Sequence, residues 1–112
     1  MGITITVKLD TARLESIIEA APGVENAVVQ RAAEQTKRFA KAVVPVATGA
    51  LRQSIDYYMV SDGFALVMAL TEYALYVEMG TRKMSARPYL VPALNAIPWV
   101  SLLREAFREV GL

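Results

Sequence analysis

The stretch YALYVEMGTRKMSARPYLVPA, residues 73–93, determines how the second half of this chain is organised. Tyr73 and Val77 are four residues apart, so they share one face of a short predicted helix. Gly80 stands where that helix should end, in the left-handed conformation that glycine adopts at helix C-termini. Pro88 favours extended backbone at the preceding residue, and Pro92 fits the first turn of a second helix. The stretch therefore predicts a helix, a loop and another helix.

The loop inside this stretch, from Thr81 to Arg87, is basic. Arg82, Lys83 and Arg87 place three cations within six positions, and no acid lies among them. Gly80 and Pro88 hold the two ends, and rigid flanks lower the ordering cost of binding. We therefore expect a contact surface for an acidic protein neighbour or for DNA phosphates. A solvated loop with no function of its own is the alternative.

Composition limits the chemistry that this chain can perform. Its 112 residues contain no cysteine and no histidine, so thiolate chemistry, the commonest general base and the commonest metal ligand are absent. Asp56 with Glu78, or Glu72 with Glu78, are the carboxylate pairs to consider for hydrolysis, but a six-residue spacing does not stack two side chains on a helix. No nucleophile–base pair or glycine-rich phosphate loop is present, so we expect no enzyme, no metal site and no cofactor.

The charge and hydropathy of the chain point to assembly. The net charge is +1, which implies no general attraction to nucleic acid or to anionic lipid. The hydrophobic fraction is 54%, above the ordinary range, and such an excess suggests surface that a partner covers. The longest charge-free run, Pro88 to Leu103, is short and interrupted by prolines, so no membrane span is expected. The N-terminus lacks the layout of a secretion signal.

Periodicity predicts both strands and helices along the chain. The Asp62-Gly63 pair signals a hairpin. The predicted strands are residues 3–9, 54–60 and 64–70, and the predicted helices are a short one carrying Leu14, Ile17 and Ile18, a long one from Val24 to Val43, and one from about Trp99 to Val110. The expected core positions of the long helix are Val24, Ala27, Val28, Ala32, Phe39 and Val43, and the expected outward positions of the sheet are Tyr57, Met59, Phe64 and Leu66.

A second motif lies upstream, between the long helix and the hairpin. It reads Val44-Pro45-x-x-Thr48-Gly49-x-Leu51-Arg52-x-Ser54-Ile55. Pro45 should end the long helix, and Thr48-Gly49 should form a turn, since glycine allows a positive φ. Leu51 and Ile55 are predicted apolar anchors, with Arg52 exposed between them.

Taken with Tyr73-Ala74-x-x-Val77-Glu78-x-Gly80-Thr81 and Met84-x-Ala86-x-Pro88-Tyr89-Leu90-x-Pro92-Ala93, this motif resembles the gene-product-ten family of the HK-type lambdoid phages. Members of that family are neck or tail-completion proteins of long-tailed bacteriophages. The sequence departs from the family pattern at Ala47, where an acid is common, and at Met79 and Tyr89, where phenylalanine is common. The hydroxyl that Tyr89 adds needs a hydrogen-bond partner.

The resemblance implies an α+β fold, with a long helix packed on a small antiparallel sheet and a C-terminal helix, in a single structural domain, residues 1–112. This domain would form a six- or twelve-fold ring of identical subunits. The ring would lie in the virion, at the neck, after synthesis in the cytoplasm of the bacterial host. Its implied partners are a head-side connector or portal-adaptor protein and a tail terminator or tail-tube protein, while phage DNA passes through the lumen with weak contacts at most. No membrane is involved. The motif and interface candidates are Pro45, Thr48, Gly49, Leu51, Arg52, Tyr73, Val77, Glu78, Gly80, Thr81, Arg82, Lys83, Arg87, Pro88, Tyr89, Leu90 and Trp99.

A small nucleic-acid-binding module without sequence specificity is the alternative function. It would require seven cations to converge and exposed tyrosines to stack on bases. The cations are Lys37, Arg38, Lys41, Arg52, Arg82, Lys83 and Arg87, and the tyrosines are Tyr57, Tyr58, Tyr73, Tyr76 and Tyr89. Trp99 can serve equally as a core residue or as an interface anchor.

Overall fold

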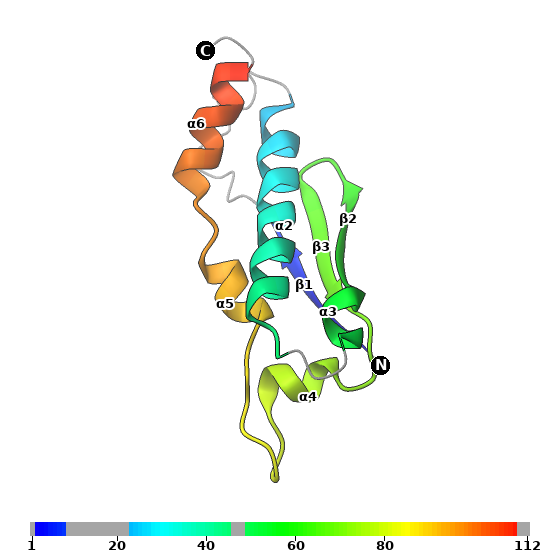
Figure 1. The fold of residues 1–112 in the computed structure, drawn as a ribbon. Helices are drawn as coiled ribbons and strands as arrows, with labels where there is room; N and C mark the ends of the chain where they lie inside the picture. Colours follow the sequence, from blue (N-terminus) through cyan, green and yellow to red (C-terminus); the bar gives the residue numbers. More distant parts are fainter. Residues whose placement is uncertain (1, 9–22, 46–48, 110–112) are drawn as a thin grey trace.

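The computed structural model describes residues 2–8, 23–45 and 49–109, and it confirms the α+β organisation. A three-stranded antiparallel sheet packs on one side of α2, and α5 and α6 lie along the other side (Figure 1). The elements are β1 (Ile3–Val7), α2 (Val24–Val43), α3 (Ala50–Ser54), β2 (Ile55–Ser61), β3 (Phe64–Ala69), α4 (Ala74–Met79), α5 (Leu90–Asn95) and α6 (Trp99–Glu109). The predicted helix with Leu14, Ile17 and Ile18, and Thr48 of the predicted turn, lie outside the described residues.

The sheet has the strand order β1–β3–β2, and α2 covers its inner face. The prediction that Tyr57 and Met59 point outward is wrong. Tyr57 is opposite Val67 and Met59 is opposite Ala65, so both lie on the inner face, where they are half-buried. In β3 the inner positions are Ala65, Val67 and Ala69, all fully buried. The two alanines at these positions let α2 approach the sheet closely. The size of a side chain therefore does not indicate which face of the sheet it occupies.

Helix α2 has the predicted bounds, but its buried stripe differs from the predicted one. The buried positions are Val24, Val28, Val29, Ala32, Ala33, Thr36 and Ala40. Phe39 and Val43, which were expected in the core, are 39% and 47% exposed. The sheet packs against one side of α2, and α5 and α6 pack against the other. The α2 positions closest to these elements carry mostly small side chains. No helix within the described residues is both long and apolar enough to cross a membrane.

The C-terminal helices follow the predicted division at Pro98. Pro92 lies in the first turn of α5, and α6 begins at Trp99. Trp99 packs against the core while part of its ring stays exposed. The Arg31 guanidinium of α2 contacts the Glu109 carboxylate of α6 and lies 3.7 Å from that of Glu105. These ion pairs, together with buried Leu102 and Ala106, fix α6 against α2.

The β2–β3 hairpin turns at Asp62 and Gly63, as predicted, with Gly63 at φ 74°. The register shifts between Met59 and Ser61, so Val60 is the extra residue of a β-bulge. The N–H of Gly63 donates a hydrogen bond of 3.2 Å to Oδ1 of Asn26 on α2. The turn is therefore held against the first part of the long helix.

Candidate functional site: the arm between α4 and α5

The connection from α4 to α5 projects from one end of the molecule (Figure 1). We call residues 81–88 the arm, because all eight are exposed. Thr81 and Met84 pair across its tip, with the Thr81 N–H donating to the Met84 carbonyl at 2.8 Å. Arg82 and Lys83 form the turn between them, and the Lys83 N–H donates to the Thr81 hydroxyl at 3.2 Å. The tip is therefore a small closed turn that presents two cations to solvent.

The base of the arm is held by a buried carboxylate. Glu78 is 5% exposed, and its Oε1 accepts hydrogen bonds from the backbone N–H groups of Tyr89, at 2.9 Å, and Leu90, at 2.7 Å. Its Oε2 accepts from the N–H of Val91 at 3.2 Å. These donors belong to the start of α5, where backbone N–H groups have no partner within the helix and a negative charge is favourable. Glu78 therefore caps α5 from α4, and both of its carboxylate oxygens are used in that cap.

Tyr89 forms the second link between the two helices. Its side chain is fully buried, and its hydroxyl donates a hydrogen bond of 2.9 Å to the carbonyl of Ala74. Burial, and after it the charge of Glu78, raise the pKa of this hydroxyl, so it stays protonated and remains a donor. The expected need of Tyr89 for a hydrogen-bond partner is thus confirmed. The N–H of Arg87 donates to the Val77 carbonyl at 2.8 Å and closes the base.

Gly80 joins α4 to the arm at φ 78°, so the predicted positive φ is confirmed. Its ψ is 173°, however, so the backbone is extended after the turn and is not in the left-handed helical conformation that we expected. The difference arises because the chain must leave α4 and run outward into the arm. A Cβ added at this position would lie 2.8 Å from the Ala86 nitrogen and 2.9 Å from the Met84 oxygen. Only glycine fits here without displacing backbone.

The solvent-facing side of α4 is apolar, which reverses the usual pattern of a surface helix. Ala74 and Glu78 are buried, and Val77 is half-buried. The Val77 N–H donates to the Tyr73 carbonyl at 3.1 Å, so these two residues lie one helical turn apart, as predicted, although Tyr73 is the more exposed of the two. Two exposed apolar residues of α4 and two in the segment just before it are together called the α4 ridge. They are Leu70, Tyr73, Tyr76 and Met79, with 62%, 41%, 50% and 70% of their surface exposed. Tyrosine and methionine are enriched at protein interfaces, so the ridge has the composition of a contact surface.

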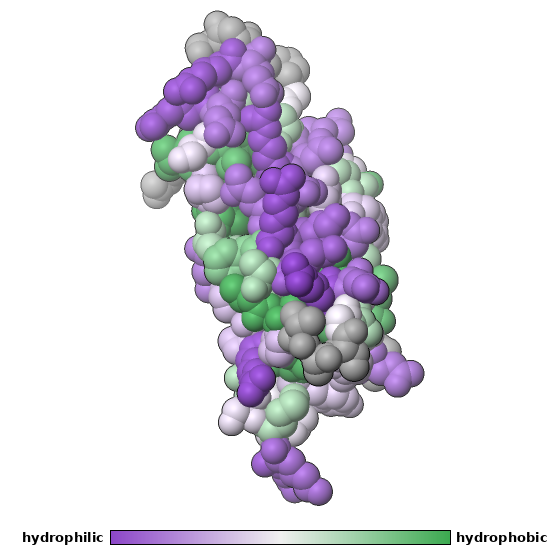
Figure 2. Space-filling view, viewed as in Figure 1, coloured by the Kyte–Doolittle hydropathy of each residue, from purple (hydrophilic) through white to green (hydrophobic). Residues whose placement is uncertain are grey.

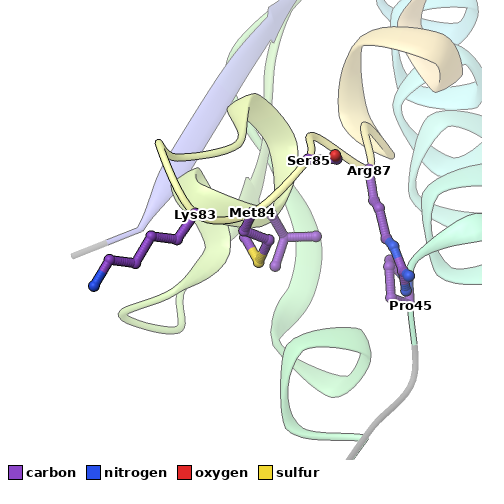
Figure 3. Close-up of a pocket in the computed structure, with 6 residues that line it drawn as sticks. Pro45, Lys83, Met84, Ser85 and Arg87 are labelled. Carbon is purple, nitrogen blue, oxygen red and sulfur yellow. The ribbon is translucent and has the colours of Figure 1, made fainter.

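A hollow of about 490 Å³ lies between the arm and the end of α2 (Figure 3). Its lining residues are Pro45, Val77, Lys83, Met84, Ser85 and Arg87. Figure 3 shows the Arg87 side chain reaching toward Pro45, while the Lys83 side chain extends away from Arg87. The hollow therefore combines apolar atoms with cationic side chains. It brings Pro45 of the upstream motif together with the arm, although the two are far apart in sequence.

The cations of the arm are uncompensated, in contrast to those of α2. Within residues 2–8, 23–45 and 49–109, no acid forms an ion pair with Arg82, Lys83 or Arg87. Lys37 lies 3.1 Å from Asp56, and Arg38 lies 3.1 Å from Glu34. Figure 2 shows the hydrophilic tip of the arm projecting alone at one end of the molecule.

Several of the cations and tyrosines considered for nucleic-acid binding are already engaged within the fold. Two of the seven cations, Lys37 and Arg38, are engaged in the ion pairs just described. Tyr89 is buried, and Tyr57 is half-buried with the Lys37 ammonium 5.8 Å from the centre of its ring. Tyr58, Tyr73 and Tyr76 remain exposed.

The other predicted site residues mainly build the scaffold. Pro45 follows the end of α2, Gly49 has φ 84° before α3, and Leu51 and Leu90 are buried in the core. Arg52 is exposed, as predicted. Sequence reasoning missed Leu70 of the α4 ridge, considered Tyr76 only for base stacking and noted Met79 only as a departure from the family pattern. Their recurrence every three residues with Tyr73 was the available signal.

The carboxylates offer no further site in the described part of the chain. No group of three or more His, Cys, Asp or Glu residues within it could hold a metal ion. Asp56 is exposed, and its pKa is lowered first by the hydrogen bond from the N–H of Tyr57 and then by Lys37. Glu78 uses both oxygens on the α5 backbone.

Comparison with protein-family models, curated proteins and solved structures finds no match for this chain. The arm, the α4 ridge and the hollow therefore have to be interpreted from their own chemistry.

Proposed function

We propose that this chain is a structural subunit of an oligomeric ring in the neck of a long-tailed bacteriophage, where it joins tail to head and lets DNA pass. The proposal starts from the two motifs described above, which resemble those of neck and tail-completion proteins. A subunit of this kind needs surfaces that bind other subunits, and it needs no catalytic group.

The single observation that supports the proposal best is the exposed apolar face of α4 beside the uncompensated arm. A monomeric protein has no need to hold Leu70, Tyr76 and Met79 in water, and apolar exposure of this kind marks interaction surfaces. The two sequence motifs also meet at this end, because Pro45 of one lines the same hollow as Val77 and Arg87 of the other. Association through this end accounts for residues that the fold itself leaves exposed.

The buried contacts at the base of the arm support the same role. Glu78, Tyr89 and the N–H of Arg87 fix the flanks of the arm to α4, so its position is set before any partner binds. A preorganised contact surface loses less conformational entropy on assembly. Within the proposed ring, the arm and the α4 ridge are the surfaces that touch a neighbouring subunit or a neck protein.

The experiment that tests this function is a cryo-electron-microscopy reconstruction of the virion whose genome encodes the chain. The expected result is a closed ring of copies between the portal and the tail tube, with the α4 ridge covered. Deletion of the gene should leave filled heads and free tails that do not join. A virion with no copy in the neck, or with isolated copies that do not touch, would rule the proposal out.

DNA binding is distinguished from ring formation by salt dependence. A ring held by apolar contacts should keep its size as salt increases, because salt screens charges and does not weaken apolar burial. A complex with DNA held by the arm cations should dissociate over the same range. Light scattering of the purified chain, with and without duplex DNA, separates the two.

A further inference from the structure

The hollow beneath the arm has the chemistry of a socket for a protein segment. Pro45, Val77 and Met84 supply apolar surface, and Arg87 supplies a cation that no described acid neutralises. A phosphate group would bind the Arg87 cation but would leave the apolar surface of the hollow exposed to water. A segment that carries an aliphatic side chain next to a carboxylate would satisfy both.

One segment of the same chain has this composition, at the tip of the β2–β3 hairpin. Val60 is the bulged residue and is 50% exposed. Asp62, two residues later, is exposed at the turn and forms no ion pair within the described residues. The bond from Gly63 to Asn26 holds this tip in place, so docking it requires little reordering.

The other carboxylates of the described residues are unsuitable. Glu34, Asp56, Glu105 and Glu109 already pair with cations of their own chain. Glu78 is buried in the cap of α5, and half-buried Glu25 packs beneath Gly63. Glu72 lies just before α4, at the same end as the hollow. Asp62 is therefore the exposed, unpaired carboxylate at the opposite end of the sheet.

We propose that the hairpin tip of one copy docks into the hollow of the next copy, with Val60 against Pro45, Val77 and Met84, and the Asp62 carboxylate on Arg87. Lys83 lines the same hollow, although its side chain extends away from Arg87. The tip and the hollow lie near opposite ends of β2, whose seven residues span roughly 20 Å, so one copy does not fill its own hollow (Figure 1). The contact joins two different surfaces, and repeated contacts of this type generate a ring when the rotation closes. Ring closure rests on the proposed function, whereas the contact itself does not.

Engineered cysteines test the contact directly, because the chain has no cysteine of its own. A variant with Ser61→Cys and Ser85→Cys keeps Asp62 and should form disulfide-linked oligomers under mild oxidation, since residue 61 is exposed next to Asp62 and residue 85 lines the hollow. The matched control pairs Ser61→Cys with Ser101→Cys on the exposed side of α6, and it should stay uncrosslinked. Equal crosslinking of the two variants would overturn the proposal.

Charge exchange tests the chemistry of the contact. Asp62→Lys alone, or Lys83→Glu with Arg87→Glu, should weaken self-association about tenfold or more, because like charges then meet at the contact. Lysine is tolerated at residue 62, where φ is not positive, and the two arm cations support no ion pair in the fold. Mixing the two variants should restore association, since each then meets a complementary partner. Sedimentation velocity of each variant and of the mixture gives the result.

The outcomes separate this inference from the proposed ring. A wild-type chain that is monomeric at every concentration, or a mixture that fails to recover, would overturn the contact. A crosslinked species that stops at two copies would retain the contact and argue against the ring. A ring that tolerates Asp62→Lys would retain the proposed function and exclude this contact.

Discussion

At the base of the arm, Glu78 and Tyr89 are buried and their polar atoms are hydrogen-bonded, whereas at its tip Arg82 and Lys83 are exposed and no described acid pairs with them. The two regions are only a few residues apart, and both carry charge. In the base, the charge is used within the fold, because the carboxylate satisfies the first N–H groups of α5. In the tip, the charges form no ion pair with the described residues, so we expect the fold to be equally stable without them.

This difference separates stability from recognition along one short segment. A buried carboxylate with three donors cannot be removed without leaving those donors unsatisfied. An exposed cation can be removed or reversed at little cost to folding. Substitutions at the base should therefore act on the free energy of unfolding, and substitutions at the tip should act on binding alone.

The largest effect is expected at Gly80. Gly80→Val should destabilise the fold by about 3 kcal/mol or more, because strain at this φ and ψ adds to a clash with the arm backbone. Urea unfolding followed by circular dichroism measures the change. The control compares Gly80→Ala with Gly49→Ala, since Gly49 also has a positive φ but, apart from its chain neighbours, no heavy atom of the described residues lies within 4 Å of the added Cβ. Equal losses at the two sites would show that the crowding at Gly80 is unimportant.

The next largest effect is expected at Glu78. Glu78→Gln keeps the shape of the side chain but removes the charge and turns one acceptor into a donor that faces an N–H of α5. We expect a loss of about 2 kcal/mol of unfolding free energy, since hydrogen bonds to charged groups contribute more than neutral ones. Glu72→Gln is the matched control, because Glu72 is exposed and has no ion pair among the described residues, and it should change stability little. If Glu78→Gln proves as mild as Glu72→Gln, the cap is not a source of stability.

The contrast also explains which features could be predicted from the sequence. The bounds of α2, the hairpin at Asp62-Gly63 and the positive φ of Gly80 depend on local patterns, so periodicity and turn chemistry identify them. The role of Glu78 depends on α5, which begins twelve residues after it, and no local pattern reveals that pairing. The resemblance singled out Glu78 as a motif residue without indicating what it binds.

The packing errors have a similar cause. Phe39 was expected in the core because it fits the three-and-four spacing of apolar residues along α2, and Tyr57 was expected on the outer side of the sheet. In the structure, Ala40 is buried and Phe39 is partly exposed, because the elements that flank α2 approach the small residues most closely. How close two elements come is a tertiary property, and hydrophobicity along a single strand or helix does not contain it.

A smaller effect is expected at Asp56, on the edge strand β2. Its pKa is lowered by the Tyr57 N–H and by Lys37, so the folded state favours the ionised form. A lowered pKa contributes stability above the unfolded value of about 4, and this stability is lost as the pH falls through the folded pKa. Asp56→Asn should therefore lower the free energy of unfolding by about a few tenths of a kcal/mol at pH 7 and by almost nothing near pH 2. Urea unfolding of both proteins at the two pH values measures the difference, and a gap that persists in acid would contradict this account.

The smallest effect on folding is expected at the tip of the arm. Arg82→Glu combined with Lys83→Glu should leave Tm nearly unchanged, because both side chains are exposed and neither forms an ion pair within the described residues. In the proposed ring, the same variant should block the joining of heads to tails, since the reversed charges would repel an acidic neighbour. Thr81→Ala is a useful companion, because it removes the hydrogen bond to the Lys83 N–H and leaves the charges in place. If the reversed variant gives infectious particles at normal titre, the tip is merely solvated and has no role in binding. If Tm falls by several degrees instead, the tip also stabilises the fold, and stability and binding are not divided between the base and the tip.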